Sequence, residues 1–280
     1  MHTRSLLLVL VLVSLSLAPG LPGEEAVSPK RGSTVWDWNE FKVKHTNVGA
    51  RRDVNDGPTA TLERFECHIS TLNPGLASHP PHQHPQEEFI ILQEGLLDVH
   101  INGVAQRVGP GSMFFFATND WHNVDSVGEK PATYLVFNLA TAATRTAPKE
   151  IAAKSAAPGT LPSSVYEWTK MKVQKTKTGE RRQLFDDPTV TCANLECHVT
   201  TLDVGQTPHA AHRHPDEELI IVKEGLVEAT INGIARTVGR GSIIFFASND
   251  EHELRNVGET PATYYVVRVV TEMTPKPAST

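Results

Sequence analysis

The stretch that decides the fold reads HQHPQEEFIIL at residues 82–92 and recurs as HRHPDEELIIV at residues 212–222. The offset from His82 to His212 is 130 positions, and other segments repeat at the same distance: Glu66-Cys67-His68 with Glu196-Cys197-His198, Ile101-Asn102-Gly103 with Ile231-Asn232-Gly233, and Pro131-Ala132-Thr133-Tyr134 with Pro261-Ala262-Thr263-Tyr264. About half of the positions aligned between residues 62 and 139 are identical, without a gap. This extent indicates duplication of a whole domain rather than a short structural repeat.

The composition is that of an ordinary globular protein with enough length for two cores. The chain has 280 residues, a formal net charge of −6 and 39% hydrophobic residues. Because it is mildly acidic and has no stripe of Lys and Arg, we expect no nucleic-acid partner. Its three cysteines are too few for a disulfide scaffold, and the odd count predicts at least one buried thiol. A bridge between Cys192 and Cys197 is left open.

The N-terminus has the pattern of a secretory signal peptide. A polar start carrying Arg4 is followed by an apolar run that continues to Leu17, with small residues at Ser16 and Ala18. We therefore predict a signal peptide at residues 1–18, cleaved after Ala18, and a secreted or periplasmic protein without membrane association after cleavage. The alternatives are a buried N-terminal helix and a membrane anchor.

Each repeat has the pattern of an antiparallel β structure. Apolar residues alternate on both sides of Asn102-Gly103 and again around Asn232-Gly233, which predicts a tight hairpin at each pair. Strand-like runs follow one another without an amphipathic helix, as in a sandwich or barrel. We place an N-terminal domain at 19–139, an Ala/Thr/Pro-rich linker at 140–160, a C-terminal domain at 161–270 and a tail at 271–280.

Histidines and a carboxylate have metal-ligand spacing in each repeat. His82 and His84 would share one face of a strand, and Glu88 has the same parity at the start of an apolar run. A carboxylate carried into an interior needs a partner, and a metal ion satisfies that need. His122 follows after a second apolar segment. The other repeat contains all four residue types at the same offset: His212, His214, Glu218 and His252.

These motifs resemble the two sequence motifs of the cupin superfamily. The first motif is matched by Gly75, the two histidines of residues 82–84, Glu88 and Gly95, and the second by the segment from Gly111 to His122. The C-terminal copy fits better, because Asn256 follows its last histidine where the N-terminal copy has Ser126. Both copies have alanine at the usual proline, Ala117 and Ala247. Since the resemblance covers nearly the whole chain after residue 18, the chain resembles a secreted bicupin with the layout of oxalate decarboxylases. The segment Pro81-His82-Gln83-His84-Pro85 also resembles germins.

The resemblance implies an all-β fold of two tandem cupin jelly-roll (double-stranded β-helix) domains that pack face to face as an internal pseudo-dimer. The runs at 89–91 and 219–221 are apolar on both strand faces, as that packing requires. It also implies one mononuclear divalent metal site per domain, two per chain. The implied ligands are His82, His84, Glu88 and His122 in one domain, and His212, His214, Glu218 and His252 in the other.

A site of three imidazoles and one carboxylate can keep positions open for a substrate or dioxygen. Mn²⁺ or Fe²⁺ suits this mixed N/O ligand set, while Cu, Zn and Ni remain open. The alternative is a degenerate cupin whose histidines serve only packing.

Several nearby residues are candidates for further roles. His79 and His209 occupy the position of the substrate-binding arginine in oxalate decarboxylases, so they are candidate catalytic groups. Glu251, which replaces Trp121 of the first repeat, is a candidate acid–base group or simply a surface difference. For the glutamates at 87 and 217 we predict solvated or hydrogen-bonded structural roles. We place the histidines at 68 and 198 on the outer strand face, away from the metal.

The predicted function is that of a metal-dependent enzyme, an oxidoreductase (oxidase or dioxygenase) or decarboxylase acting on a small carboxylate or enolic substrate. A non-redox sugar- or uronate-processing enzyme and a non-catalytic metal- or carbohydrate-binding bicupin are the alternatives. Retention of eight ligands argues against the last. The expected partner is a small-molecule substrate, and homo-oligomerisation is left open, as are the substrate, the metal and the division of labour between the two sites.

Overall fold

The computed structural model describes residues 29–146 and 158–276. The predicted signal peptide lies outside the described residues. Within the described part of the chain, no helix has the length and apolar character needed to cross a bilayer.

The described chain is almost entirely β, as expected. It forms two similar units, each with one seven-stranded and one three-stranded antiparallel sheet. The elements that precede residue 147 are β1 (Thr34–Trp36), the 3₁₀ helix η1 (Trp38–Glu40), β2 (Lys44–Thr46), β3 (Gly49–Gly57), β4 (Arg64–Leu72), β5 (Glu87–Glu94), β6 (Leu97–Ile101), β7 (Val104–Val108), β8 (Met113–Phe116), β9 (His122–Ser126), β10 (Ala132–Ala140) and α1 (Ala142–Thr146).

The second half repeats the first. Its elements are β11 (Ser164–Tyr166), the 3₁₀ helix η2 (Trp168–Lys170), β12 (Gln174–Lys175), β13 (Gly179–Asp187), β14 (Asn194–Leu202), β15 (Glu217–Glu224), β16 (Leu226–Ile231), β17 (Ile234–Gly239), β18 (Ile243–Phe246), β19 (His252–Asn256) and β20 (Ala262–Val270). The N-terminal unit contains the sheets β11-β8-β5-β10-β4-β3-β2 and β7-β6-β9, and the C-terminal unit contains β1-β18-β15-β20-β14-β13-β12 and β17-β16-β19.

The hairpins predicted at the two Asn-Gly pairs are confirmed. β6 pairs with β7 across Asn102-Gly103, and β16 pairs with β17 across Asn232-Gly233. Asn102 has φ 48° and Gly103 has φ 82°, and the second pair repeats these values closely at 47° and 82°. Two successive left-handed residues are what a tight two-residue hairpin turn requires.

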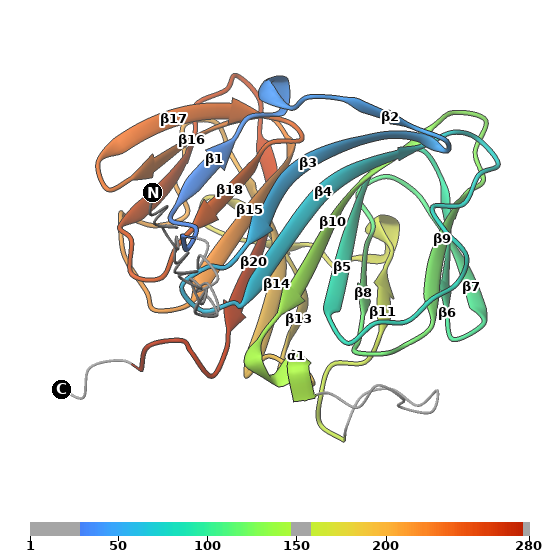
Figure 1. Cartoon of the computed structure of the whole chain (residues 1–280). Coiled ribbons are helices and arrows are strands. Elements are labelled where there is room, and N and C mark those ends of the chain that lie inside the picture. Colours follow the sequence, from blue (N-terminus) through green and yellow to red (C-terminus); the bar gives the residue numbers. More distant parts are fainter. Residues whose placement is uncertain (1–28, 147–157, 277–280) are drawn as a thin grey trace, which may run out of the picture.

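The two units exchange their first strands, so each seven-stranded sheet contains one strand from the other half of the sequence. β1 pairs with β18 of the C-terminal unit, and β11 pairs with β8 of the N-terminal unit. Figure 1 shows β1, in blue, beside β18 and β15 among the orange strands, and β11 beside β8. Each exchanged strand leads into a tryptophan that lies against a glycine of the other unit. At Gly111, for example, a Cβ atom would lie 2.8 Å from Trp168 Cδ2.

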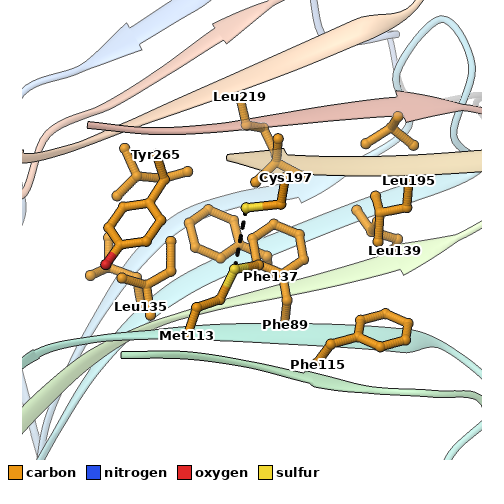
Figure 2. Close-up of a cluster of buried hydrophobic side chains, with 14 of the residues drawn as sticks. Phe89, Met113, Phe115, Leu135, Phe137, Leu139, Leu195, Cys197, Leu219 and Tyr265 are labelled. Atoms are coloured by element: carbon orange, nitrogen blue, oxygen red, sulfur yellow. Dashed lines mark hydrogen bonds between the residues drawn. The ribbon is translucent and has the colours of Figure 1, made fainter. Parts of the chain in front are cut away.

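The largest core lies between the two units, which confirms the prediction that both strand faces are buried. It contains Phe89 and Phe115 from one unit and Leu219 and Phe245 from the other. Figure 2 shows such side chains from both units packed together. Two smaller cores fill the interiors of the two barrels. Ile90 belongs to the barrel core although Phe89 faces the other unit, because successive side chains of a strand point to opposite faces.

All three cysteines are buried free thiols. The bridge between Cys192 and Cys197 that the sequence left open is therefore absent from the structure. Cys197 instead points into the core between the units, where its Sγ lies 3.3 Å from Met113 Sδ (Figure 2).

One buried glutamate in each unit forms hydrogen bonds with a loop of the other unit. Glu87 is fully buried, and it accepts hydrogen bonds from the hydroxyls of Thr189 (2.6 Å) and Thr191 (2.7 Å) and from the backbone N–H of Val190 (2.9 Å). Glu217 makes the equivalent contacts with residues 59–61 of the N-terminal unit. Glu87 and Glu217 therefore have the hydrogen-bonded structural role that was predicted as one of two, and they are not solvated.

Candidate metal centres

A backbone bridge brings the histidines of the N-terminal unit together. His82 and His84 lie in the loop before β5, and His122 is the first residue of β9. They are not on one regular strand, as the sequence reasoning assumed, because the strand begins only at Glu87. The backbone of His82 exchanges two hydrogen bonds with that of His122, at 3.1 and 2.9 Å. As a result, nitrogen atoms from all three rings lie within 4.8 Å of one another.

Hydrogen bonds fix the tautomer of these rings. Nδ1 of His84 donates to the backbone oxygen of Gln86 at 2.9 Å, and Nδ1 of His122 donates to that of Asp120 at 2.8 Å. Since a carbonyl can only accept, the proton is on Nδ1 and the lone pair is on Nε2. Nε2 of His122 is buried and has no hydrogen-bond partner among the described residues. A metal ion is the natural partner for converging lone pairs of this kind.

Glu88 completes this arrangement. Its Oε2 lies 3.7 Å from Nε2 of His84, and its Oε1 lies 4.0 Å from Nε2 of His122. Two ligands about 2.1 Å from one metal ion lie about 3–4 Å apart, depending on the angle between them. The separations are thus too long for good hydrogen bonds but suit ligands of one ion.

Electrostatics at His122 and Glu88 favour the protonation states that metal ligands need, whereas contact with Glu88 raises the pKa of His84. Burial lowers the pKa of His122 to about 4, which keeps its imidazole neutral at pH 7. Burial alone would raise the pKa of Glu88, but contacts with His84 and His122 outweigh it and lower the pKa. A neutral imidazole beside an ionised carboxylate is the donor set expected for a divalent ion, so these residues fit one.

The C-terminal unit repeats this geometry. The nitrogen atoms of His212, His214 and His252 also lie within 4.8 Å of one another. Nε2 atoms of His214 and His252 are buried without hydrogen-bond partners in the described chain, and Oε2 of Glu218 lies 3.4 Å from that of His214. The structure therefore contains two His-rich sites with metal-binding geometry, one in each unit.

A comparison with protein-family models matches the cupin domain at residues 68–138 and again at residues 198–268, which together make up half of the chain. The chain belongs to the cupin family. The two matches confirm a bicupin, as the sequence motifs indicated.

Solved structures similar to this bicupin include oxalate decarboxylases. That of Bacillus subtilis, in a study of its Mn(II) centres, has a TM-score of 0.63 and 15% sequence identity, with 89% of this chain and 80% of that chain covered. The Lactobacillus farciminis oxalate decarboxylase formate complex has a TM-score of 0.61 and 14% identity, with 86% and 88% covered. AerE from Microcystis aeruginosa has a TM-score of 0.61 and 13% identity, with 84% and 98% covered. At these identities the likeness shows the fold. A comparison with curated protein sequences finds no match.

Each metal site of the bicupin opens into a cavity of small-molecule size. The N-terminal cavity has a volume of about 530 Å³ and the C-terminal cavity about 470 Å³. Phe116 walls the first and stacks on the ring of His122, with ring centroids 4.2 Å apart. Phe246 and His252 repeat this contact. The aromatic wall excludes water from one side of the site and leaves the other side accessible.

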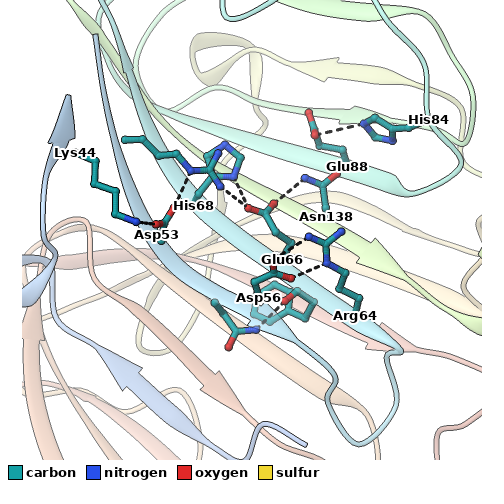
Figure 3. Close-up of polar contacts among 12 residues, drawn as sticks. Lys44, Asp53, Asp56, Arg64, Glu66, His68, His84, Glu88 and Asn138 are labelled. Atoms are coloured by element: carbon teal, nitrogen blue, oxygen red, sulfur yellow. Dashed lines mark hydrogen bonds and ion pairs between the residues drawn. The ribbon is translucent and has the colours of Figure 1, made fainter. Parts of the chain in front are cut away.

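His68 lies in this cavity and not on the outer face, so the sequence reasoning about it was wrong. The inference assumed that Cys67 faces the barrel interior, but Cys67 faces the other unit because the outer sheet surface is also buried. Nδ1 of His68 donates to Glu66 Oε1 at 2.7 Å, and Glu66 Oε2 accepts from Asn138 at 3.0 Å. Figure 3 shows Glu66 between His68 and Asn138, with Glu88 beyond. His198 lines the C-terminal cavity in the same way, and its Nδ1 donates to Glu196 Oε1 at 2.7 Å.

The repeated Glu-Cys-His sequence was the available signal for these two pairs. A glutamate and a histidine two residues apart in both copies share one strand face, and identical polar residues on a face are unusual for a surface. What the sequence could not show was which face that is.

The other candidate residues occupy different positions. His79 and His209 are exposed, line the cavities and pack against the first ligand histidine, with ring centroids 4.1 Å apart in both units. Glu251 is at the surface, outside the cavity lining, and its Oε2 forms an ion pair with Arg213 at 2.9 Å. Its position agrees with the surface difference that the sequence left as the alternative.

Proposed function

We propose that this bicupin is a metal-dependent oxidoreductase or decarboxylase that acts on a small carboxylate or enolic substrate. The observation that supports it most is the convergence of three imidazole nitrogens at each site, where Nε2 of His122, His214 and His252 is buried without a hydrogen-bond partner among the described residues. A divalent ion held there supplies Lewis acidity and, if it is Mn or Fe, a redox couple. The cavity above each site accommodates a substrate of modest size.

The proposed ligands are those expected from the sequence: His82, His84, Glu88 and His122, with His212, His214, Glu218 and His252 in the second unit. Mn²⁺ is our first choice of ion. It suits a mixed N/O ligand set, and the structurally similar Bacillus subtilis oxalate decarboxylase contains Mn(II) centres.

His68 is the proposed proton-transfer group of the N-terminal cavity. Because its Nδ1–H is held by Glu66, the ring has a fixed orientation and Nε2 is the nitrogen left for substrate. Arg51 in turn binds Glu66 at 2.9 Å and keeps the carboxylate in place. The arrangement resembles a catalytic His–carboxylate pair in which the acid orients the base.

Oxalate is not the favoured substrate. The structure places His79 and His209 at the cavity edges, where oxalate decarboxylases carry an arginine by family resemblance. A histidine lacks the two-pronged donor geometry that an arginine offers a carboxylate, and its charge depends on pH. We therefore favour monocarboxylates and enolic compounds, and this same observation keeps a Lewis-acid reaction on uronates as the second candidate.

The first test is metal content followed by a substrate screen. Protein isolated from its native host should contain a divalent metal at both sites, and His122→Ala and His252→Ala should each lose about half of it. The screen uses oxalate, flavonols, β-diketones and uronates, with and without dioxygen. Turnover that requires dioxygen supports an oxidase or dioxygenase, while anaerobic conversion of a uronate supports the second candidate. Absence of bound metal in native protein would refute both.

A second test separates proton transfer from structural support. With the best substrate of the screen, His68→Gln should lower kcat by about 100-fold or more and leave KM nearly unchanged. His45→Gln, an exposed histidine on β2, is the matched control. A loss in KM alone would show that His68 binds substrate without transferring a proton.

A further inference from the structure

The two metal sites differ in the groups that surround equivalent ligands. Residues 86 and 216 lie at equivalent positions two residues after a ligand histidine, yet one is Gln86 and the other Asp216. Residues 138 and 268 are also equivalent, and they are Asn138 and Arg268. The four ligands are the same in both sites, so any difference between the sites must come from neighbours such as these.

In the C-terminal site a carboxylate faces the ligand imidazole. Nδ1 of His214 lies 3.2 Å from Asp216 Oδ1, in addition to 2.9 Å from the backbone oxygen of the same residue. Asp216 is buried, with 5% of its surface exposed. Its other oxygen, Oδ2, accepts a hydrogen bond from Arg268 Nε at 2.6 Å, which fixes the carboxylate beside the ring.

In the N-terminal site this carboxylate is missing. Nδ1 of His84 has the backbone oxygen of Gln86 at 2.9 Å, and the side chain of Gln86 is neutral. Asn138, at the position of Arg268, donates to Glu66 instead. Nδ1 of His84 therefore has a carbonyl partner and no charged one.

A carboxylate beside Nδ1–H makes the opposite nitrogen of the ring a better electron donor and adds negative charge near the cation. Loss of such a partner typically lowers metal affinity by about 10- to 100-fold. Arg268 offsets only part of this charge, because 43% of its side chain is exposed and water screens it, whereas Asp216 is enclosed with the ligand.

We propose that the two metal sites are inequivalent and that the C-terminal site binds a divalent cation more tightly, with Asp216 as the residue that sets the difference. This inference rests on the proposed metal sites. It predicts that the C-terminal site fills first when the metal is limiting, and that the N-terminal site needs a higher metal concentration to fill.

The experiment measures Mn²⁺ binding to each site separately in the full chain. His122→Ala leaves the C-terminal site, and His252→Ala leaves the N-terminal site. After metal removal, calorimetric titration with Mn²⁺ gives the Kd of each variant, and the EPR signal of free Mn²⁺ gives an independent count. We expect the C-terminal site to bind at least about 10-fold more tightly.

Two exchanges test the cause. Asp216→Asn in the His122→Ala background should weaken Mn²⁺ binding by about 10-fold or more, and Gln86→Asp in the His252→Ala background should strengthen it. Asp203→Asn, an exposed aspartate of the same unit, is the control. Circular dichroism verifies the fold of each variant, and Gln86→Asp carries the test if Asp216→Asn does not fold. Equal Kd values for the two sites, or no effect of either exchange, would overturn the inference. No Mn²⁺ binding at either site would instead refute the proposed function.

Discussion

Glu66 shows at the residue scale how the cavity keeps a buried acid ionised. Only 12% of its side chain is exposed, and burial by itself would raise its pKa. Hydrogen bonds from His68 and Asn138 and the charge of Arg51 outweigh burial, so the pKa lies below its usual value. The ionised form is thus the one that the folded state prefers.

This preference predicts an acid-dependent loss of stability. A carboxyl group whose pKa is lower in the folded state stabilises the protein above its unfolded pKa, here 4.5, and loses that contribution as pH falls through the folded pKa. Glu66→Gln should therefore lower the unfolding free energy of the metal-free protein at pH 7, by about 1–3 kcal/mol. Its stability should also fall less steeply than that of the wild type between roughly pH 5 and pH 3.

Urea unfolding across this pH range checks the prediction, with Glu129→Gln, an exposed glutamate, as the control. Parallel pH profiles for Glu66→Gln and the wild type would contradict it.

At the scale of elements, two motif glycines that look alike in the sequence have different physical roles. Gly95 forms the turn between β5 and β6 with φ 85°, and a Cβ atom there would lie 2.6 Å from the backbone Cα of Ala132. Gly75 has φ 75°, but a Cβ atom would meet nothing within 4 Å. Gly95 is required both by its backbone conformation and by close packing, whereas Gly75 is required by its backbone conformation alone.

Alanine substitutions should separate these two causes. Gly95→Ala should destabilise the protein by about 3 kcal/mol or more, because backbone atoms must move. Gly75→Ala should cost about 1 kcal/mol, the penalty of a left-handed residue with a side chain. Thermal unfolding of both variants gives the comparison, and equal losses would show that packing at Gly95 contributes nothing.

The contact of β15 with residues 59–61 is the second feature at this scale. Glu217 has 1% of its surface exposed and accepts hydrogen bonds from Thr59, Thr61 and the backbone of Ala60. Glu217→Ala would leave these donors buried without an acceptor, so we expect a loss of about 3 kcal/mol. Glu129→Ala, which changes an exposed residue, should be neutral in the same urea titration. A neutral Glu217→Ala would mean that water replaces the carboxylate.

At the scale of the whole molecule, the two units share one core and exchange edge strands. The core between them contains residues of both, and each seven-stranded sheet has an edge strand from the other half of the chain. Neither unit can bury its outer sheet face alone, since that face is covered by its counterpart.

We therefore expect a single unfolding transition for the metal-free protein, with equal calorimetric and van't Hoff enthalpies. Residues 29–146 and 158–276 expressed as separate chains should not fold alone and should regain structure when mixed. Two resolved transitions, or a stable isolated half with a native near-UV spectrum, would contradict this expectation.

The sequence alone determined the duplication, the all-β class, the hairpins and the histidines of both metal sites. These features follow from local periodicity and from residue types at fixed spacing, which are written along the chain. Glu88 illustrates this, because a glutamate at the start of an apolar run predicts a buried carboxylate that needs a partner, whatever packs against the strand.

Only the tertiary structure decided the exchanged strands, the outward-facing Cys67 and the position of His68 in the cavity. A strand that is apolar on one face and polar on the other usually places the polar face in water, but here the apolar face meets a second unit and the polar face lines a cavity. Which side of a strand is inside depends on what packs against it, and that information lies in contacts between residues far apart in the chain.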